Sequence, residues 1–329
     1  MKVIDMHCDT IYEIDRLLRE GKDITLRKNH LNIDLEKMQQ SHYILQNFAV
    51  FTHLKKVNDP VEHVQHLIDT FYLEIEKNKD IIDVVYKYDD IIHNQKNHKM
   101  SALLTLEEGA VIHNDFSYLR NYYRLGVRMI TLNWNFVNGI GFPNFDMNHE
   151  LHGYHTCDTE NGLTEFGIQY VQECERLGII IDVSHLSDAG FYDVLKYTTK
   201  PFVASHSNAR SVCAHARNMD DQMIKELAKR GGVLGINFAA DFLDENLEEG
   251  ALSKVSSMVK HILYIKSIAG IDCIGLGSDF DGIPQNLEIK DASYMSLLYN
   301  DLLEAGLSEE DVRKVFYENV LNLYKKVLI

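Results

Sequence analysis

Acidic residues and histidines follow several of the short apolar runs in this sequence, at the points where the runs end. These run-end groups are His7-Cys8-Asp9, Glu107-Glu108, Asp182 with Ser184-His185, Ser205-His206, and Asp279-Phe280-Asp281. Imidazole nitrogens and carboxylate oxygens are the donors that zinc and similar divalent ions bind in proteins. Because an apolar strand has no use for unpaired ionisable groups, something must compensate them.

Each group also has a purely structural interpretation. The alternatives are a hydrogen-bonded pair for His7 and Asp9, a satisfied strand end for His185 and for His206, a helix cap for Glu107 and Glu108, and a solvated turn for Asp279 and Asp281. Their joint occurrence favours a shared metal site, because random scatter would seldom place so many ligand types at run ends while leaving the interiors apolar. Together they offer enough nitrogen and oxygen donors for two ions, and a carboxylate can bridge two such ions.

The other histidines lie on helical or loop-like segments, and we expect most of them to be solvated. They are His30, His42, His53, His63, His66, His93, His98, His113, His149, His152, His155, His215 and His261. We except His152 and His155, because they belong to a long irregular segment that could close over a site. Strand alternation turns Cys8 away from His7 and Asp9, so we expect it to be a packing residue.

Eight apolar, β-branched runs predict strands, and segments with helical periodicity separate them. The strands are expected at 2–7, 44–51, 101–107, 127–133, 178–184, 201–206, 232–238 and 273–279. Helices are expected within 59–94, 164–178, 219–232, 252–270 and 308–328. Thr164 and Ser308 stand before acidic first turns, whereas Gly178 and Gly270 follow the last periodic residues, as at helix ends.

This alternation over 329 residues predicts an α/β fold, a (β/α)8 barrel that forms a single domain over residues 1–329, rather than an open doubly wound sheet. No glycine-rich phosphate-binding motif follows any expected strand, which disfavours a nucleotide site. The carboxyl ends of barrel strands meet at one mouth, so the run-end residues would converge there. The longest irregular segment, 136–162, is expected to be a loop that covers this mouth.

The composition excludes several classes of protein. The hydrophobic fraction of 45% and charged fraction of 25% are those of an ordinary globular protein. With 33 Lys and Arg against 49 Asp and Glu, a net charge of -16 and no basic cluster, nucleic acid is not an expected partner. No window approaches the length of a membrane helix, and the five cysteines are scattered, so we expect a cytoplasmic protein with reduced thiols and no membrane partner.

With these residues in view, the chain resembles the renal, or membrane, dipeptidase family, particularly its bacterial cytoplasmic branch, and through it the metal-dependent amidohydrolase-like barrels. The resemblance runs nearly end to end. Its motifs are IDMHCDT (4–10), LTLEEGA (104–110), GLTEFG (162–167), LGIIIDVSHLS (177–187), PFVASHSNARSVCAHARN (201–218) and IGLGSDFDGIP (274–284). They occur in the family's order and with suitable intervals.

The resemblance implies a ligand set for two zinc ions. It makes His7 and Asp9 ligands of one ion and His185 and His206 ligands of the other, with Glu107 as the carboxylate that bridges both. Glu107 is preferred to Glu108 because the family's glutamate directly follows the apolar run. Manganese or cobalt would suit the same donors.

The resemblance also bears on three further positions. Asp279 would lie beside the first ion and orient or deprotonate the attacking water, and Arg217 would hold the substrate carboxylate. From the sequence alone, Arg217 is more typical of a surface salt bridge. The chain departs from renal-type members at Trp134, which stands where they have a histidine that binds the substrate or its oxyanion.

The implied activity is hydrolysis of dipeptides, including those with a C-terminal D-residue, by a water activated between two zinc ions. The family also suggests a homodimer. A second interpretation is an amidohydrolase-like enzyme that acts on another amide, a lactam or an ester. A third is a metal-containing barrel without turnover that serves as a binding protein.

Overall fold

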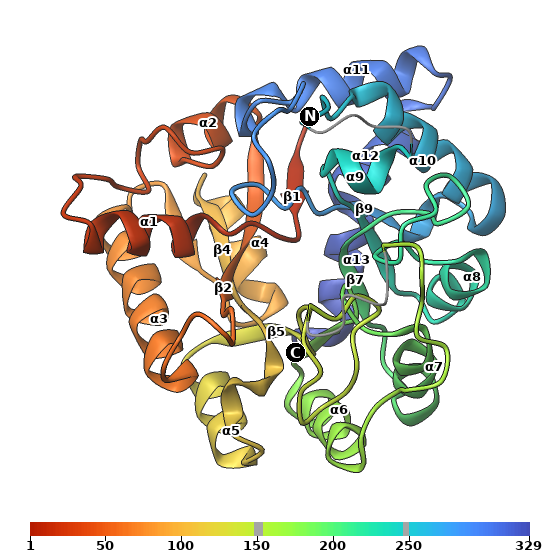
Figure 1. Ribbon diagram of the computed structural model, residues 1–329. Helices are drawn as coiled ribbons and strands as arrows, with labels where there is room; N and C mark the ends of the chain where they lie inside the picture. Colours follow the sequence, from red (N-terminus) through yellow and green to blue (C-terminus); the bar gives the residue numbers. More distant parts are fainter. Residues whose placement is uncertain (148–153, 246–249) are drawn as a thin grey trace.

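The computed structural model of the protein describes residues 1–147, 154–245 and 250–329. Eight parallel strands form a closed barrel in the order β1-β2-β4-β5-β6-β7-β8-β9, and β9 pairs with β1 (Figure 1). The strands are β1 (Val3–Asp5), β2 (Tyr43–Phe51), β4 (Met100–Glu107), β5 (Val127–Thr131), β6 (Ile180–Asp182), β7 (Val203–Ser207), β8 (Val233–Ile236) and β9 (Ile274–Leu276). The predicted (β/α)8 barrel is therefore confirmed.

All eight expected strands exist, but most are shorter than the apolar runs that predicted them. The chain leaves the ladder at Asp5 in β1, at Asp182 in β6 and at Leu276 in β9. His7, His185 and Asp279 thus lie just beyond their strands. Residues beyond a strand no longer alternate across the sheet, so their side chains can turn toward the barrel axis.

The segment 59–94 was expected to be helical throughout, and this prediction is wrong in its middle. It contains α3 (Pro60–Lys77), the short strand β3 (Ile82–Val84) and most of α4 (Tyr88–Lys96). β3 pairs only with the first residues of β4, from Met100 to Ala102, whereas β5 pairs with β4 from Leu104 onward. A run of apolar residues this short fits a helix or a strand equally well. It forms a strand here because the first residues of β4 are not paired with β5 and can pair with it.

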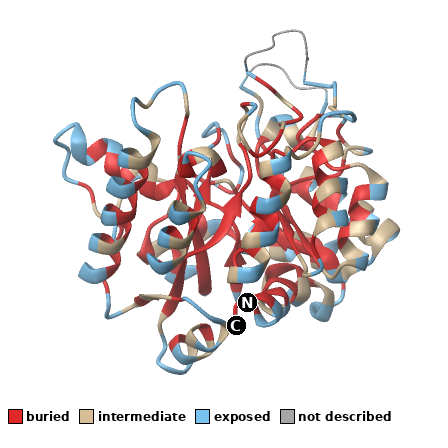
Figure 2. Ribbon diagram, turned by 90° about the horizontal axis from the view of Figure 1, so that it is seen from below, coloured by how far each residue is buried: buried red, intermediate tan, exposed pale blue. Residues whose placement is uncertain are grey.

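Helices surround the barrel on the outside (Figure 1). They include α1 (Thr10–Arg19), α2 (Leu35–Gln40), α5 (Phe116–Arg124), α6 (Glu165–Leu177), α7 (Asp188–Tyr197), α8 (Asp221–Lys229), α9 (Ala240–Leu243), α10 (Val255–Ala269), α11 (Ser296–Glu304), α12 (Glu309–Arg313) and α13 (Asn319–Val327). Their inner sides are buried and their outer sides exposed, as in Figure 2. The predicted caps are confirmed for α6, where the Thr164 side chain accepts from the Gly167 amide and Gly178 is left-handed, at φ 82°.

The C-terminal helix closes one end of the barrel. The expected helix over 308–328 is α12, a π-helical turn at Lys314–Glu318, and α13 in succession. Val320, Leu323 and Tyr324 of α13 pack against inward side chains such as Ile4 and Met6. Tyr324 Oη also donates to Asn47 Oδ1 of β2 at 2.9 Å. This plug leaves only the opposite mouth, at the carboxyl ends of the strands, for a site.

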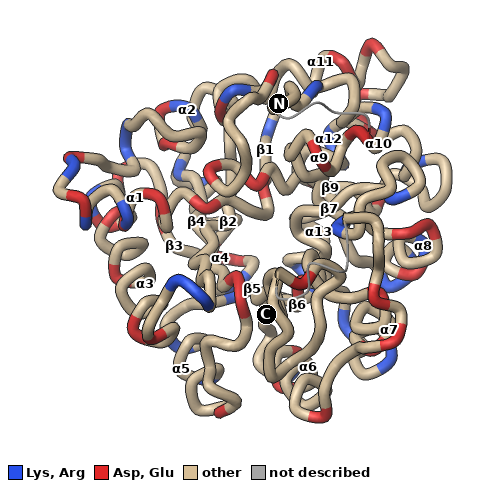
Figure 3. The backbone as a smooth tube through the Cα atoms, in the orientation of Figure 1, with Lys and Arg blue, Asp and Glu red and all other residues tan. Residues whose placement is uncertain are grey.

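Charged side chains lie mainly on the outer helices and loops. Figure 3 shows the basic positions scattered rather than gathered into one patch. Within the parts of the chain that the structure describes, no helix has the length and apolar character needed to cross a bilayer. Cys8 is buried, and its thiol donates to the Asn47 carbonyl at 3.4 Å, which agrees with its expected packing role.

Candidate metal centre and active site

Six run-end residues meet at the open mouth of the barrel. His7 and Asp9 follow β1, Glu107 ends β4, His185 follows β6, His206 lies in β7 and Asp279 follows β9. Asp279 is partly buried and the other five are buried. The convergence expected from the sequence is therefore observed, and it joins residues up to 272 positions apart, from His7 to Asp279.

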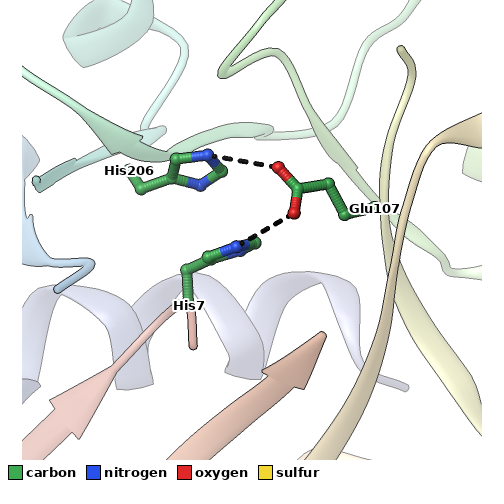
Figure 4. Close-up of side chains that lie close together, drawn as sticks. All are labelled: His7, Glu107 and His206. Carbon is green, nitrogen blue, oxygen red and sulfur yellow. Dashed lines mark ion pairs between the residues drawn. The ribbon is translucent and has the colours of Figure 1, made fainter. Parts of the chain in front are cut away.

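Glu107 lies between two sets of imidazoles. Its Oε2 is 3.3 Å from His7 Nε2, and its Oε1 is 3.1 Å from His185 Nε2 and 3.6 Å from His206 Nε2. Figure 4 shows the carboxylate reaching toward His7 with one oxygen and toward His206 with the other. The ring nitrogens His185 Nε2 and His206 Nε2 lie 3.1 Å apart. One carboxylate thus faces two separate donor groups, which is the arrangement that a bridging ligand requires.

Two further carboxylates, those of Asp9 and Asp279, also lie near His7. His7 Nε2 is 3.7 Å from Asp9 Oδ2 and 3.8 Å from Asp279 Oδ1. Gly282 makes this approach possible, because a Cβ there would lie 2.1 Å from Asp9 Oδ2 and 2.7 Å from Asp279 Oδ1. Any side chain at position 282 would therefore displace the carboxylates.

The donor atoms fit a divalent cation. Ligand atoms of His7, Glu107 and His206 lie within 4.8 Å of one another, and so do those of His7, Asp9 and Asp279. His7 Nε2 and Asp9 Oδ1 are buried and have no hydrogen-bond partner among the described residues. Buried polar atoms without partners are costly, and a bound cation would satisfy both. Imidazole and carboxylate donors together suit zinc, manganese or cobalt.

The histidines are oriented by hydrogen bonds on their far sides. His206 Nδ1 lies 2.8 Å from Ser205 Oγ, and Ser205 Oγ donates to Asp182 at 2.6 Å. His185 Nδ1 lies 2.8 Å from Asn135 Oδ1. Both rings consequently present Nε2 to the cluster, as metal-binding histidines with such outer partners do. Sequence analysis assigned no role to Asn135 or Ser205, although Ser205 directly precedes a candidate ligand.

Burial and mutual charge perturb these groups. Burial raises the pKa of Asp279 to about 7 and that of Asp9 to about 6, and nearby carboxylates add to both shifts. Burial alone would raise the pKa of Glu107, but His7 and His185 hold it well below its usual range. Burial and the charge of Arg217 lower the pKa of His185 to about 4. Burial alone would lower the pKa of His7, but Glu107 and Asp9 hold it well above its usual range. Positive charge among these carboxylates is therefore favourable, and a bound cation would supply it.

Glu108 has a different function from Glu107. Its carboxylate accepts from the amides of Ala110 at 2.9 Å and Trp134 at 3.1 Å and from Asn138 Nδ2 at 2.6 Å. It caps the short 3-10 helix η1 (Gly109–Ile112). Of the two adjacent glutamates, Glu107 faces the cluster. The helix cap expected as an alternative for both is correct for Glu108. Asp281 is likewise structural, since it accepts from Thr10 Oγ1 at 2.6 Å.

Asp279 is fixed rigidly. Its Oδ2 accepts from Asn237 Nδ2 at 2.9 Å, its amide donates to the His7 carbonyl at 3.2 Å, and its backbone is left-handed, at φ 62°. Such a backbone is strained for a residue other than glycine and often marks a functional position. Oδ1 is left facing the cluster.

Arg217 lies in the same cavity, so the surface salt-bridge interpretation is wrong. Arg217 is 5% exposed, and it donates from Nη2 to the His206 carbonyl at 3.1 Å and from Nη1 to Ser207 Oγ at 3.4 Å. Its Nε is buried without a partner, and no carboxylate of the described chain forms an ion pair with it. Burial lowers its pKa to about 10, so the guanidinium stays charged. Asp279, Glu107 and Asp182 raise its pKa against the effect of burial, but none pairs with it directly, so the guanidinium keeps hydrogen-bonding capacity for an anionic ligand.

A cavity of about 600 Å³ opens above the cluster. Its lining includes Asp9, Glu107, Trp134, His185, Arg217 and Asp279. Trp134 is partly buried in the wall of the cavity. From the segment 136–162, Phe145, Met147 and Tyr154 also line the cavity.

Three histidines expected to be solvated are buried instead. His53 and His215 line the cavity, and His261 is a core residue between the Ala209 amide and the Leu243 carbonyl. Their helical or loop positions carried no signal of burial in the sequence. His155 is exposed and contacts the Ala214 carbonyl, whereas His149 and His152 lie outside the described residues.

Comparison with known proteins gives a consistent result. The family model described as membrane dipeptidase, peptidase family M19, matches residues 1–328. A protein named as an uncharacterized dipeptidase of Schizosaccharomyces pombe is 31% identical over 99% of this chain and 80% of its own length. Human dipeptidase 3 is 33% identical over 70% of this chain and 45% of its own length.

Solved structures agree with the sequence relatives. A dipeptidase of family M19 superimposes with a TM-score of 0.90 and 25% identity, over 100% of this chain and 99% of the other. A metallopeptidase from Rhodobacter sphaeroides, liganded with a phosphinate mimic of the dipeptide L-Ala-D-Ala, has a TM-score of 0.89 and 24% identity over 99% of each chain. With a whole-chain family match and a converging cluster of metal-ligand side chains, the chain belongs to the membrane dipeptidase family, M19, a family of metal-dependent hydrolases.

Proposed function

We propose that this protein is a dipeptidase that hydrolyses its substrate with two zinc ions bound at the barrel mouth. The observation that carries the proposal is the buried guanidinium of Arg217, which forms no ion pair with a described residue. It shares its cavity with four of the six candidate metal ligands, Asp9, Glu107, His185 and Asp279. A cation fixed at one side of a metal cluster selects substrates whose carboxylate ends near the scissile bond. Dipeptides are the peptides that meet this condition.

In this proposal His7 and Asp9 would hold one ion, His185 and His206 would hold the other, and Glu107 would serve as a ligand of both. The position of Glu107 between two imidazole groups supports the bridging role. Two zinc ions bound there would supply Lewis acidity and an activated water, so no side-chain nucleophile is required. Manganese or cobalt in place of zinc is an alternative that metal analysis distinguishes.

Asp279 is proposed as the general base. Asn237 holds its Oδ2, which leaves Oδ1 to accept a proton from the attacking water. The water oxygen forms the new bond to the peptide carbon, the carbon–nitrogen bond breaks, and the proton passes from Asp279 to the departing amine. A group that both takes and returns the proton needs the fixed orientation that this carboxylate has.

Arg217 is proposed to bind the C-terminal carboxylate through two parallel hydrogen bonds. The proposal extends to dipeptides with a C-terminal D-residue, and the ligand of the Rhodobacter sphaeroides structure supports this extension. An amidohydrolase acting on a neutral amide, lactam or ester would not need Arg217. A barrel without turnover would not need a rigidly held Asp279.

Several broader predictions are part of the same proposal. We propose a single catalytic domain over residues 1–329, with the segment 136–162 as a cover for the cavity and Trp134 in contact with the substrate. The lining residues Phe145 and Tyr154 support the cover. A homodimer in the cytoplasm stays a prediction, which light scattering and cell fractionation would test.

Metal analysis combined with dipeptide hydrolysis tests the proposal directly. We expect about two metal ions per chain in the purified parent and turnover of simple dipeptides. His185→Ala should lose metal, whereas Asp279→Asn should lose at least about a hundredfold in kcat, because general-base catalysis contributes about that much. Near-parental turnover by Asp279→Asn would remove the proposed base, and a metal-loaded parent that cleaves no dipeptide would refute the function.

A further inference from the structure

Four ring side chains form a continuous cluster at one side of the mouth, which we name the aromatic wall: Phe51, His53, Trp134 and Phe136. The Trp134 ring lies 5.0 Å from Phe51, 5.1 Å from His53 and 5.6 Å from Phe136, centroid to centroid, and His53 lies 5.1 Å from Phe136. Phe51, His53 and Trp134 line the cavity. Phe136, 3% exposed, supports them from behind.

The barrel order places the β2 part of this wall, Phe51 and His53, opposite Arg217, and its β5 part, Trp134, two strands from β7. Phe51 and His53 come from the end of β2, and Trp134 follows β5, on either side of β4, whereas Arg217 follows β7. In a closed ring of eight strands, β2 and β7 lie four positions apart, on opposite sides (Figure 1). Glu107 ends β4, on the wall's side of the cluster. A molecule held by Arg217 at one end and cleaved at the cluster therefore extends its other end toward the wall.

The wall offers flat ring faces that are mostly apolar, with one polar ring, His53, whose buried Nδ1 has no hydrogen-bond partner among the described residues. Within the described parts of the chain, none of its side chains forms a hydrogen bond or an ion pair with another residue. Charged groups of both signs lie beside it: Lys55 Nζ lies 5.3 Å from the Phe136 centroid, Lys56 and Glu13 line the cavity, and Glu107 pairs with Phe51 across the strands. Aromatic rings favour contacts with other rings and with alkyl groups, whereas a lysine side chain that enters such a wall loses hydration.

We propose that the aromatic wall is the subsite for the side chain of the N-terminal residue and that it selects aromatic and large apolar side chains over glycine and lysine. The inference rests on the proposed dipeptidase function and on Arg217 binding the C-terminal carboxylate. Trp134 and Phe51 are its main specificity residues, because they flank the wall on the cavity side. Glu108 positions Trp134 by accepting the hydrogen bond from its amide.

Two dipeptide series separate this subsite from the rest of the cavity. The first is X-Gly and the second is Gly-X, each with X as glycine, leucine, phenylalanine or lysine, assayed with the zinc-loaded protein. We expect kcat/KM for Phe-Gly to exceed that for Gly-Gly by about tenfold or more, since filling an apolar pocket gives discrimination of this size. Lys-Gly should be a poorer substrate than Leu-Gly.

Trp134→Ala should reduce the Phe-Gly to Gly-Gly ratio to about threefold or less and leave the Gly-Phe to Gly-Gly ratio within about twofold of the parent. Phe51→Leu should reduce the first ratio less. The matched control is Phe242→Ala, an aromatic residue on the Arg217 side, 5.3 Å from the guanidinium, which should change the second series instead. A ratio of kcat/KM values for two substrates, measured on one preparation, does not depend on the fraction of the protein that is folded.

The outcomes separate the two proposals. An unchanged X-Gly preference in Trp134→Ala, or a change confined to the Gly-X series, would overturn the subsite while dipeptide hydrolysis stands. A zinc-loaded parent that cleaves neither series would overturn the proposed function, and the subsite with it.

Discussion

Arg217 shows how burial changes the meaning of a residue. In water an arginine is satisfied by solvent, but here the side chain is 5% exposed and has no acidic partner in the described chain. Its contacts are two oxygen atoms, of the His206 carbonyl and the Ser207 hydroxyl. A permanent charge with unfilled hydrogen-bond capacity is a recognition site for an anion, and the neighbouring cluster suggests which end of the substrate that anion belongs to.

Arg217→Met should therefore weaken selection of the free carboxylate. We expect kcat/KM for a dipeptide to fall about a hundredfold, because hydrogen bonds to charged groups contribute about 1.5–3 kcal/mol each. The amidated dipeptide should change much less. In the variant, the ratio of kcat/KM for the free dipeptide to kcat/KM for the amidated dipeptide should approach one when the two are measured side by side. Equal losses for both substrates would show that Arg217 acts on folding or metal binding instead.

Gly282 offers a second test at the scale of one residue. Gly282→Ala adds a methyl group 2.1 Å from Asp9 Oδ2, so we expect Asp9 to shift and zinc affinity to fall about ten- to a hundredfold. Titration with a fluorescent zinc chelator measures the affinity. Gly141→Ala is the matched control, since its added methyl would lie 3.4 Å or more from its neighbours. Parental affinity in Gly282→Ala would show that Asp9 is not held for a metal.

Among the elements, α13 contributes to the stability of the barrel and not to the site. It plugs the barrel end opposite the site, where Leu323 is 1% exposed. The helix contributes no side chain to the cavity. The barrel therefore assigns its two ends different tasks, as TIM-type barrels generally do.

Leu323→Ala should lower the free energy of unfolding by about 2–5 kcal/mol, the usual cost of a leucine-sized cavity, and leave KM for dipeptides unchanged. Denaturant unfolding and steady-state kinetics measure the two effects. The exposed neighbour Asn322→Ala is the control and should alter neither. A large rise in KM for Leu323→Ala would mean that the plug and the mouth are coupled.

At the scale of the whole molecule, the cluster concentrates negative charge that folding alone does not compensate. Asp9 and Glu107, which are buried, and Asp279, which is partly buried, line one cavity of a chain whose net charge is -16. Ions that bind only the folded state stabilise it in proportion to the logarithm of their concentration. Metal should accordingly be part of the stability of the native protein.

Removal of metal by a chelator should lower the melting temperature by several degrees. Free metal at a thousand times its dissociation constant stabilises by about 4 kcal/mol, and added zinc should restore that amount. Differential scanning calorimetry measures the shift. His206→Ala serves as the control, because it should respond less to zinc. If the chelator leaves the parent's melting temperature unchanged, the unpartnered His7 and Asp9 atoms are compensated in another way.

The sequence by itself determined the barrel class and the identity of the clustered residues. Apolar runs of strand length, several of them ending in ligand-type residues, carry both kinds of information locally, so His7, His206, Asp279 and the pair Glu107-Glu108 could be named. Local pattern is enough here because strand formation and strand ends depend on neighbouring residues.

Only the tertiary structure decided the remaining questions. The choice between Glu107 and Glu108, the short strand β3, the burial of Arg217 and His53, and the pairing of Phe51 with Trp134 all depend on contacts between distant segments. Glu108 turns away from the cluster because its carboxylate accepts hydrogen bonds from amides of η1 and Trp134. Arg217 is buried because the chain after β7 folds over the mouth. Such contacts exist only once the barrel has closed, so no local sequence pattern records them.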